Sequence, residues 1–406
     1  MRILLKNSKI ILSFIIFLIS CEEPNKSDSI WDENDIGSST PVISTVTPSQ
    51  NAFAGIDTIL ISGSNFSENM TENHVYFNGI PGTILSSTAS RMVVITPNLV
   101  SDSVKITVSV QGAFIFGEYV NLYSLTAAVV EYGPFDQFTD IYSLDLDRQE
   151  NLLVSMDASP DAQFWQVNTQ QDSSVWSSAL VKASGMKLGP NGSVYFVNYQ
   201  RFLYRDEQGT PKENSEIFKR LNGNATDLDF DEYGNLYLGG TGSTIDVVDV
   251  DNEDGLTDGV IEAIDLDTLD VIALKVHEQF LYMLTTNVSS NQIVYRAPIL
   301  DNTGSLGELE IVFDWSTYTN REASAFCMTL NESGDLFIGS NWGIQPLTIV
   351  QNGVASGFYN SILSEPINYM AWGNERYLYA LSRGEDSRKI LRVDTRMMGS
   401  EYYGRP

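Results

Sequence analysis

The sequence is poor in cysteine and histidine. Its 406 residues include two of each: Cys21, Cys327, His74 and His277. Cys327 lies in the apolar run SAFCMTL, which indicates a buried, inert thiol. So few histidines leave no set for a zinc site or a histidine-based catalytic triad. The sequence also lacks the GxSxG elbow and the P-loop, which argues against the hydrolase and nucleotide-binding classes that depend on them.

Positive charge is also scarce. The chain has 24 Lys and Arg against 52 Asp and Glu, and its formal net charge is −28. A surface this acidic repels phosphate backbones, so we expect no nucleic-acid partner. It suits neutral partners, cations or an extracellular setting.

Long hydrophobic runs are limited to one, IILSFIIFLIS at residues 10–20, which follows Arg2, Lys6 and Lys9. A transmembrane helix needs about 20 apolar residues, so this run is typical of a signal peptide. It ends in LISC (residues 18–21), which resembles the lipobox of bacterial lipoproteins. That resemblance implies cleavage after residue 20, acylation of Cys21 and membrane attachment. With Cys21 acylated, no intrachain disulfide can form.

Residues 21–40 are predicted to be the acylated Cys21 and a flexible acidic tether, because residues 22–40 are rich in Ser, Asp and Glu and poor in apolar residues.

Residues 41–125 predict a small β-sandwich, because β-rich runs alternate with Gly, Pro and Asn every ten to twenty residues. The pattern resembles the TIG family of immunoglobulin-like domains. In secreted bacterial proteins that resemblance implies a spacer between an anchor and a binding module. Gly63 and Gly79 are expected in tight turns. The matching residues are Pro41-x-Ile43, Pro48, Gly55, Ile59-x-Ile61-x-Gly63-x-Asn65-Phe66, Val75-x-Phe77-Asn78-Gly79, Ile95-x-Pro97 and Val104-x-Ile106-x-Val108-x-Val110-x-Gly112.

Residues 127–406 contain one motif six times: an alternating strand, a polar turn and a second alternating strand, as in DFDEYGNLYLGG at residues 229–240. A period near 42 residues, with one insertion, predicts a six-bladed β-propeller in an all-β chain. The copies resemble NHL-type and gluconolactonase-like propellers. Residues 127–133 are expected to pair with the last strands, around 389–395, and close the ring. The first apolar residues after each turn are Leu152, Val194, Leu236, Leu281, Leu336 and Leu378.

Loops that follow the second strand of each blade are expected to surround a ligand face. Five residues past each anchor lie Asp157, Tyr199, Thr241, Thr286, Asn341 and Arg383, and Asn198, Asn287 and Trp342 are adjacent to such positions. Stacking on aromatic rings and hydrogen bonds to amides and carboxylates suit sugars. Solvated loop tips would have a similar composition. The predicted ligand-binding residues are Asp157, Asn198, Tyr199, Asn287, Asn341, Trp342 and Arg383.

A second candidate is the acidic stretch DVVDVDNEDGLTDG at residues 246–259, which resembles DxDxDG calcium loops but has one extra residue before Gly255. Carboxylates around a glycine turn suit Ca²⁺, and an acidic solvated hairpin is the alternative. The predicted calcium ligands are Asp249, Asp251, Asp254 and Asp258, and no other cofactor is required.

The layout resembles surface lipoproteins of Bacteroidota-like bacteria that capture glycans at the outer membrane. It implies a lipid-anchored, non-catalytic binding protein of the cell envelope whose partner is a glycan or an envelope protein. Two alternatives stay open: a propeller enzyme, either a lactonase-like hydrolase or a polysaccharide lyase, and a protein-interaction scaffold. A metal-dependent lactonase needs converging Glu, Asn and Asp. Asp157, Asn198 and Asn287 are candidates for this, but no early channel Glu matches that family.

Overall fold

The computed structural model describes residues 37–405 except 137, 160, 364–365 and 385–387. The predicted signal peptide, Cys21 and most of the predicted tether therefore lie outside the described residues. Two compact units are present: residues 37–49, 59–95 and 103–123 form one, and residues 50–58, 96–102 and 124–405 form the other. None of the described helices has the length and apolarity to cross a membrane.

The amino-terminal β-sandwich is built from short, mostly antiparallel strands whose alternate side chains are buried. Ile59 and Ile61 of one sheet and Ile106 and Val108 of the other are fully buried, as period-2 alternation requires. The first sheet has the strand order β1 (Val42–Thr47), β3 (Thr58–Ser64), β7 (Arg91–Ile95), β6 (Thr83–Thr88), and the second has the order β10 (Gly117–Glu118), β9 (Ile106–Val110), β4 (Asn73–Phe77), β5 (Ile80–Pro81). A third sheet has the order β2 (Ala52–Phe53), β11 (Tyr123–Thr126), β8 (Ser101–Val104). The helical turn η1 (Met70–Glu72) precedes β4.

Gly63 and Gly79 are required for different reasons. Gly79 has φ +86° in the turn after β4, as expected. Gly63 instead lies inside β3, so the expectation of a turn at this position was wrong. A Cβ at Gly63 would meet the carbonyl oxygen of Val42 at 1.8 Å, beside a bulge in β1. Close backbone approach therefore excludes a side chain there.

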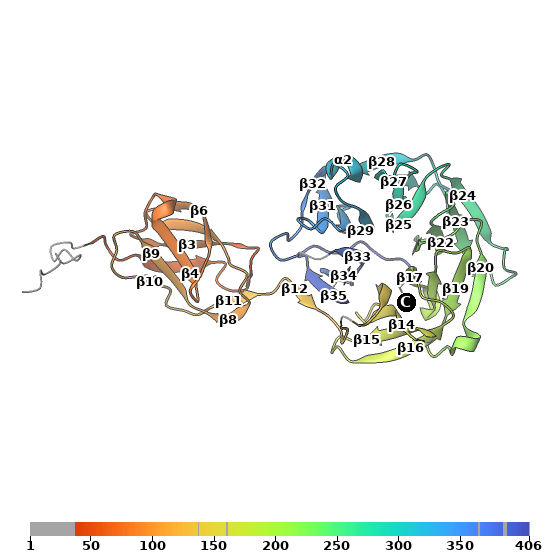
Figure 1. Cartoon of the computed structure of the whole chain (residues 1–406), viewed down its shortest axis with the longest axis horizontal. Coiled ribbons are helices and arrows are strands. Elements are labelled where there is room, and N and C mark those ends of the chain that lie inside the picture. Colours follow the sequence, from red (N-terminus) through yellow and green to blue (C-terminus); the bar gives the residue numbers. More distant parts are fainter. Residues whose placement is uncertain (1–36, 137, 160, 364–365, 385–387, 406) are drawn as a thin grey trace, which may run out of the picture. The chain divides into compact units, whose positions relative to one another are not determined.

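The propeller consists of six four-stranded antiparallel sheets arranged around a ring (Figure 1). Blade 1 is β13 (Ile141–Leu146), β14 (Leu152–Ala158), β15 (Asp161–Val167), β16 (Ser173–Ala179); blade 2 is β17 (Gly185–Leu188), β18 (Val194–Val197), β19 (Phe202–Asp206), β20 (Glu216–Arg220); blade 3 is β21 (Asp227–Phe230), β22 (Asn235–Gly239), β23 (Thr244–Asp249), β24 (Val260–Asp265). Blade 4 is β25 (Asp270–His277), β26 (Phe280–Thr286), β27 (Gln292–Pro298), β28 (Glu310–Asp314); blade 5 is β29 (Ala325–Leu330), β30 (Leu336–Ser340), β31 (Leu347–Gln351), β32 (Val354–Gly357); blade 6 is β33 (Ile367–Trp372), β34 (Tyr377–Arg383), β35 (Arg388–Asp394), β12 (Val129–Glu131). The helical turns are η2 (Pro190–Gly192), η3 (Lys212–Asn214) and α2 (Trp315–Tyr318).

Ring closure follows the expectation. β12 pairs antiparallel with β35, with Val129 opposite Val393, so a strand from the start of the propeller completes the last blade. Each of the six predicted anchor residues lies at the first or second position of the second strand of its blade. The 42-residue period therefore predicted both the number of blades and their register.

A six-membered charged layer crosses the middle of the channel, and we call it the channel belt. It takes one residue from the same position of each inner strand, and its four charged members alternate in sign around the ring: Asp145, Lys187, Asp229, Lys275, Thr329 and Ala371. The Lys187 ammonium lies 3.6 Å from the carboxylates of both Asp145 and Asp229. All six side chains are buried. The belt fills the channel with charges that are paired across blades rather than with apolar side chains.

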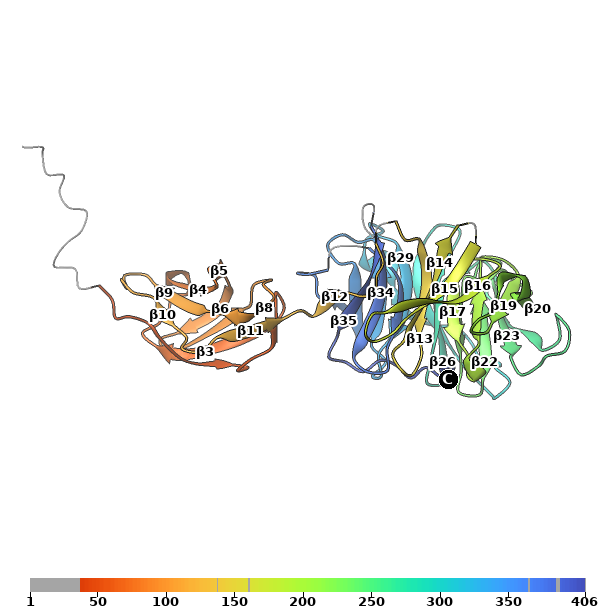
Figure 2. The ribbon, with the colours of Figure 1, turned by 90° about the horizontal axis from the view of Figure 1, so that it is seen from below.

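The carboxyl-terminal residues 397–405 cover one end of the channel, and we call them the strap. Figure 2 shows the C-terminus at one end of the ring. The strap binds the last residues of the inner strands: the backbone N–H of Ser400 donates to the carbonyl of Leu330 (3.2 Å), and the Tyr402 hydroxyl donates to the carbonyl of Leu188. The Tyr402 ring lies 4.4 Å from the Lys187 ammonium, directly below the belt.

Blade 2 contains a buried carboxyl, Asp206, at the end of β19, and burial raises its pKa to about 6. A carboxyl with a higher pKa in the folded than in the unfolded chain binds its proton more tightly when folded. The tighter proton binding stabilises the folded chain. This stabilisation is complete below about pH 4 and is lost as the pH rises through about 6.

We expect Asp206→Asn to unfold with the same free energy as the wild type near pH 4, and to be more stable by about 2–3 kcal/mol at pH 7.5. Urea unfolding at both pH values measures the difference. Asp157→Asn is the control, and its stability relative to the wild type should change with pH in the opposite direction, because a hydrogen bond from Lys182 lowers the pKa of Asp157. If Asp206→Asn increased the free energy of unfolding by the same amount at both pH values, the prediction would be wrong.

Candidate functional site

The end of the channel opposite the strap opens into a cavity of about 370 Å³, which we call the cup. Its floor is formed by the uppermost channel layer, in which the Tyr369 hydroxyl donates to Asp227 (3.2 Å). Asp227 in turn accepts a hydrogen bond from the backbone N–H of Leu274 (3.0 Å) in the next blade. The belt and the strap lie below this floor, so the described residues make the cup accessible from one end of the ring.

The wall of the cup contains a ring with one half-buried residue from each blade, at the same position just above the floor. These residues are Tyr142, Ser184, Thr226, Ile272, Phe326 and Asn368. In blades 1, 4, 5 and 6 the ring residue falls where the pairing of the inner strand shifts register. A β-bulge leaves one residue unpaired and re-aims its side chain. The bulges thus place Tyr142, Ile272, Phe326 and Asn368 in the wall.

An outer ring of loop residues extends the wall above this layer. Four of the six predicted loop positions line the cup: Tyr199, Thr241, Thr286 and Arg383. Tyr199 is 62% exposed and has φ +50°, which holds the residue in the left-handed region at the rim. The structure therefore brings residues of four blades together at the rim of the cup.

Arg383 and Tyr142 form the cationic side of the cup. The Arg383 guanidinium lies 4.8 Å from the centre of the Tyr142 ring and donates to the carbonyl of Ile141. Burial lowers the pKa of Arg383 from its usual value. Asp270 lies two blades away, on the wall formed by blade 4, where it accepts a hydrogen bond from the backbone N–H of Gly242 (3.1 Å).

The remaining predicted ligand-binding residues do not line the cup. Asp157 forms an ion pair with Lys182 (2.6 Å), and the Lys182 ammonium lies 3.2 Å from the hydroxyl of Tyr142 in the wall. Asp157 is therefore linked to the wall through Lys182. Asn198 is half-buried beside Tyr199. Asn287 accepts hydrogen bonds from the backbone N–H groups of Ser289 (2.9 Å) and Asn291 (3.0 Å) and so organises its own turn.

The two predicted residues of blade 5, Asn341 and Trp342, contact other loop residues of the same part of the ring. Asn341 accepts a hydrogen bond from the backbone N–H of Ser324 (2.8 Å). Trp342 is half-buried and packs edge-to-face against Trp315 (6.2 Å) and Tyr318 (5.6 Å). Trp342 was expected to be an exposed stacking platform, and this packing corrects that expectation.

The acidic stretch 246–259 is held by cations of the protein. The Lys219 ammonium donates to the carbonyls of Asp254 (2.8 Å) and Gly255 (2.9 Å), and Arg205 pairs with Glu253 (2.7 Å). In the described part of the chain, no three His, Cys, Asp or Glu side chains gather in a way that could hold a metal ion. The structure therefore does not bring together Asp249, Asp251, Asp254 and Asp258, and calcium binding by them stays a prediction.

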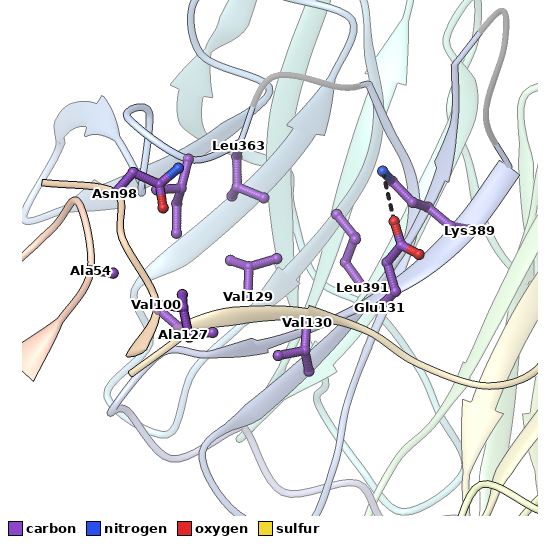
Figure 3. A pocket seen from close by; sticks show the side chains of 12 residues that line it. Ala54, Asn98, Val100, Ala127, Val129, Val130, Glu131, Leu363, Lys389 and Leu391 are labelled. Atoms are coloured by element: carbon purple, nitrogen blue, oxygen red, sulfur yellow. Dashed lines mark ion pairs between the residues drawn. The ribbon is translucent and has the colours of Figure 1, made fainter. Parts of the chain in front are cut away.

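A second cavity of about 240 Å³ lies beside β12 in the unit that contains the ring (Figure 3). Val129 and Leu391 contribute aliphatic surface, and the ion pair between Glu131 and Lys389 (3.2 Å) uses the charges of two lining residues. This cavity offers a ligand fewer aromatic and hydroxyl groups than the cup does.

Cys327 belongs to the floor of the cup and is 3% exposed, as the apolar run around it indicated. Burial raises the pKa of its thiol. A nucleophilic cysteine needs a lowered pKa, so this environment suits a structural thiol.

Comparisons with known proteins support this architecture. Residues 41–126 match the model of the IPT/TIG domain family. No curated protein sequence matches the chain. Solved structures of similar fold include the following three. A Bacteroides thetaiotaomicron protein described as a candidate phosphatase is 12% identical and has a TM-score of 0.57, over 90% of this chain and 99% of that one.

The second is an auxiliary nutrient binding protein from Bacteroides thetaiotaomicron, 11% identical with a TM-score of 0.50, over 88% of this chain and 98% of that one. The third is a luciferin-regenerating enzyme, 14% identical with a TM-score of 0.52, over 68% of this chain and 98% of that one. At these identities the likeness shows the fold alone. The chain is an all-β protein in which an IPT/TIG immunoglobulin-like sandwich precedes a six-bladed β-propeller.

Proposed function

We propose that this chain is a binding protein of the cell envelope that holds a glycan in the cup. The observation that carries the proposal is the cup itself: a cavity of about 370 Å³ lined by aromatic rings, hydroxyl groups and a few charged groups. Ligand sites in proteins are typically concave cavities of about 300–1,000 Å³ in which a few polar groups fix the orientation of the ligand.

The aromatic members of the wall suit sugars because a pyranose ring stacks its C–H face on an aromatic ring. Tyr199, Tyr142 and Phe326 come from blades 2, 1 and 5, so their rings are distributed around the cavity. Thr226, Thr241 and Thr286 supply hydroxyl groups from the intervening wall. The auxiliary nutrient binding protein shares the fold, and a binding role of that kind is consistent with this proposal.

The envelope location in the proposal rests on the lipobox at Leu18–Cys21, which lies outside the described residues. An acylated Cys21 would tether the chain to a membrane, with the outer membrane favoured, and the IPT/TIG domain would act as a spacer.

Tyr199→Ala is expected to weaken glycan binding about 5- to 30-fold, because a lost stacking contact costs about 1–2 kcal/mol. Affinity electrophoresis of residues 22–406 in gels that contain soluble polysaccharides measures this as lost retardation. Tyr233→Ala is the matched control, since Tyr233 is 53% exposed in the β21–β22 turn at the opposite end of the blade. Equal retardation of both variants would refute binding in the cup, and shortening of the glycan would indicate an enzyme.

A further inference from the structure

Among the described residues that line the cup, one is cationic, Arg383. Arg383 lies at the end of β34, and its backbone N–H donates to the side-chain oxygen of Asn368 (2.9 Å), a member of the ring above the floor. Its guanidinium stacks on Tyr142 and donates to the carbonyl of Ile141. Backbone, ring and carbonyl contacts therefore fix the position of the guanidinium in the wall.

The charge of Arg383 is not matched by a carboxylate of any described residue. Within the described part of the chain, Arg383 forms no ion pair, whereas nearby cations are paired: Lys182 with Asp157, Arg388 with Asp140 and Lys389 with Glu131. This is unusual for a chain with 52 acidic and 24 basic residues. A half-buried cation without a counter-charge is costly for the free protein, and burial accordingly lowers the pKa of Arg383.

The wall formed by blades 3 and 4 carries hydrogen-bond acceptors and hydroxyl groups instead of a cation. Asp270 keeps acceptor capacity after its hydrogen bond from Gly242, and Thr226 and Thr241 add hydroxyl groups beside it. Carboxylate oxygens accept hydrogen bonds from sugar hydroxyls. Asp227, the other carboxylate of the cup, is already used by Leu274 and Tyr369 and lies 4.0 Å from the Lys275 ammonium. The cup is thus polarised, with a cation on one wall and hydrogen-bond acceptors on the other.

We propose that the ligand is an acidic glycan, and that Arg383 binds the carboxylate of a uronic acid while the wall around Asp270 accepts hydrogen bonds from its hydroxyl groups. This proposal rests on the proposed function and narrows it to one class of sugar. An arginine presents a planar fork of N–H donors that matches a carboxylate in a bidentate contact. Arg383 lines the cup, and its guanidinium has more N–H donors than the one that the Ile141 carbonyl accepts.

The test is affinity electrophoresis with polygalacturonate, alginate and hyaluronate, each beside its carboxyl-reduced form, in which the uronate has become a neutral hexose. Neutral dextran and dextran sulfate complete the panel. The gels contain about 0.15 M salt to screen the repulsion between an acidic protein and a polyanion. Wild type, Arg383→Gln, Arg383→Lys and Arg296→Gln are compared. Arg296 pairs with Glu310 on the outer strands of blade 4 and serves as the control.

We expect one carboxylated glycan to retard the wild type and its carboxyl-reduced form to fail. Arg383→Gln should weaken binding about 10- to 100-fold, Arg383→Lys should recover part of this, and Arg296→Gln should behave as wild type. If a neutral glycan binds wild type and Arg383→Gln equally while Tyr199→Ala abolishes retardation, the proposed function holds and this inference fails. Equal retardation by dextran sulfate would also overturn it, and absence of any retardation would overturn both.

Discussion

Lys187→Met should destabilise the propeller by about 3–5 kcal/mol. The ammonium of Lys187 lies 3.6 Å from Asp145 and 3.6 Å from Asp229, and all three side chains are nearly inaccessible to water. Breaking a buried ion pair is costly because the remaining charges lose their partner without regaining solvent. Methionine has a similar length, so the cost comes from the two uncompensated carboxylates rather than from a large cavity.

Urea unfolding of the wild type and of Lys187→Met at pH 7.5 measures this loss. Thr329→Val, in the same layer, is the uncharged control and should cost less than about 1.5 kcal/mol. A cost for Lys187→Met no larger than that for Thr329→Val would contradict the prediction.

Tyr402→Ala should cost about 2–3 kcal/mol, because a half-buried aromatic side chain is lost and water gains access to the belt. The ring lies 4.4 Å from the Lys187 ammonium and 5.2 Å from the Arg405 guanidinium. Tyr402→Phe keeps the ring and removes only the hydrogen bond to Leu188, so it should cost about 1 kcal/mol. Thermal and urea unfolding measure both variants.

The strap and the cup lie at opposite ends of the channel, so Tyr402→Ala should leave glycan retardation unchanged at temperatures where the variant is folded. Tyr233→Ala again serves as the control and should change the free energy of unfolding by less than about 0.5 kcal/mol. A Tyr402→Ala variant that keeps wild-type stability but loses glycan binding would show that the strap acts on the site rather than on the fold.

The repeat made the ring predictable from the sequence. Strand, polar turn and strand recur with fixed spacing, and the period gave the number of blades, the second-strand positions and the closure between residues 127–133 and 389–395. The loop positions of Tyr199, Thr241, Thr286 and Arg383 followed from the same register, because loops at equivalent positions of a ring point to one face. The strand–turn–strand repeat was therefore sufficient to predict the number of blades and their register.

The inner wall of the cup was not predicted, for a physical reason. Tyr142, Ile272, Phe326 and Asn368 enter the cavity at bulges, and strict alternation along a strand does not reveal where pairing shifts. Together with Ser184 and Thr226 they recur at intervals of 42, 42, 46, 54 and 42 residues, and this recurrence was the available signal. Trp342 failed as a platform because residues of α2, far from it in sequence, cover it. Tertiary contacts of this kind lie outside a repeat pattern.

Closure of the ring by β12 and β35 also sets an order of events during synthesis. Val129 is made early and Val393 late, yet the two are opposite each other in one sheet. The early strand must wait, unpaired, until more than two hundred further residues have left the ribosome. Such a long sequence separation slows folding, because the chain loses loop entropy before the pairing compensates for it. Completion of the last blade therefore carries a larger loop-entropy cost than any hairpin within a blade.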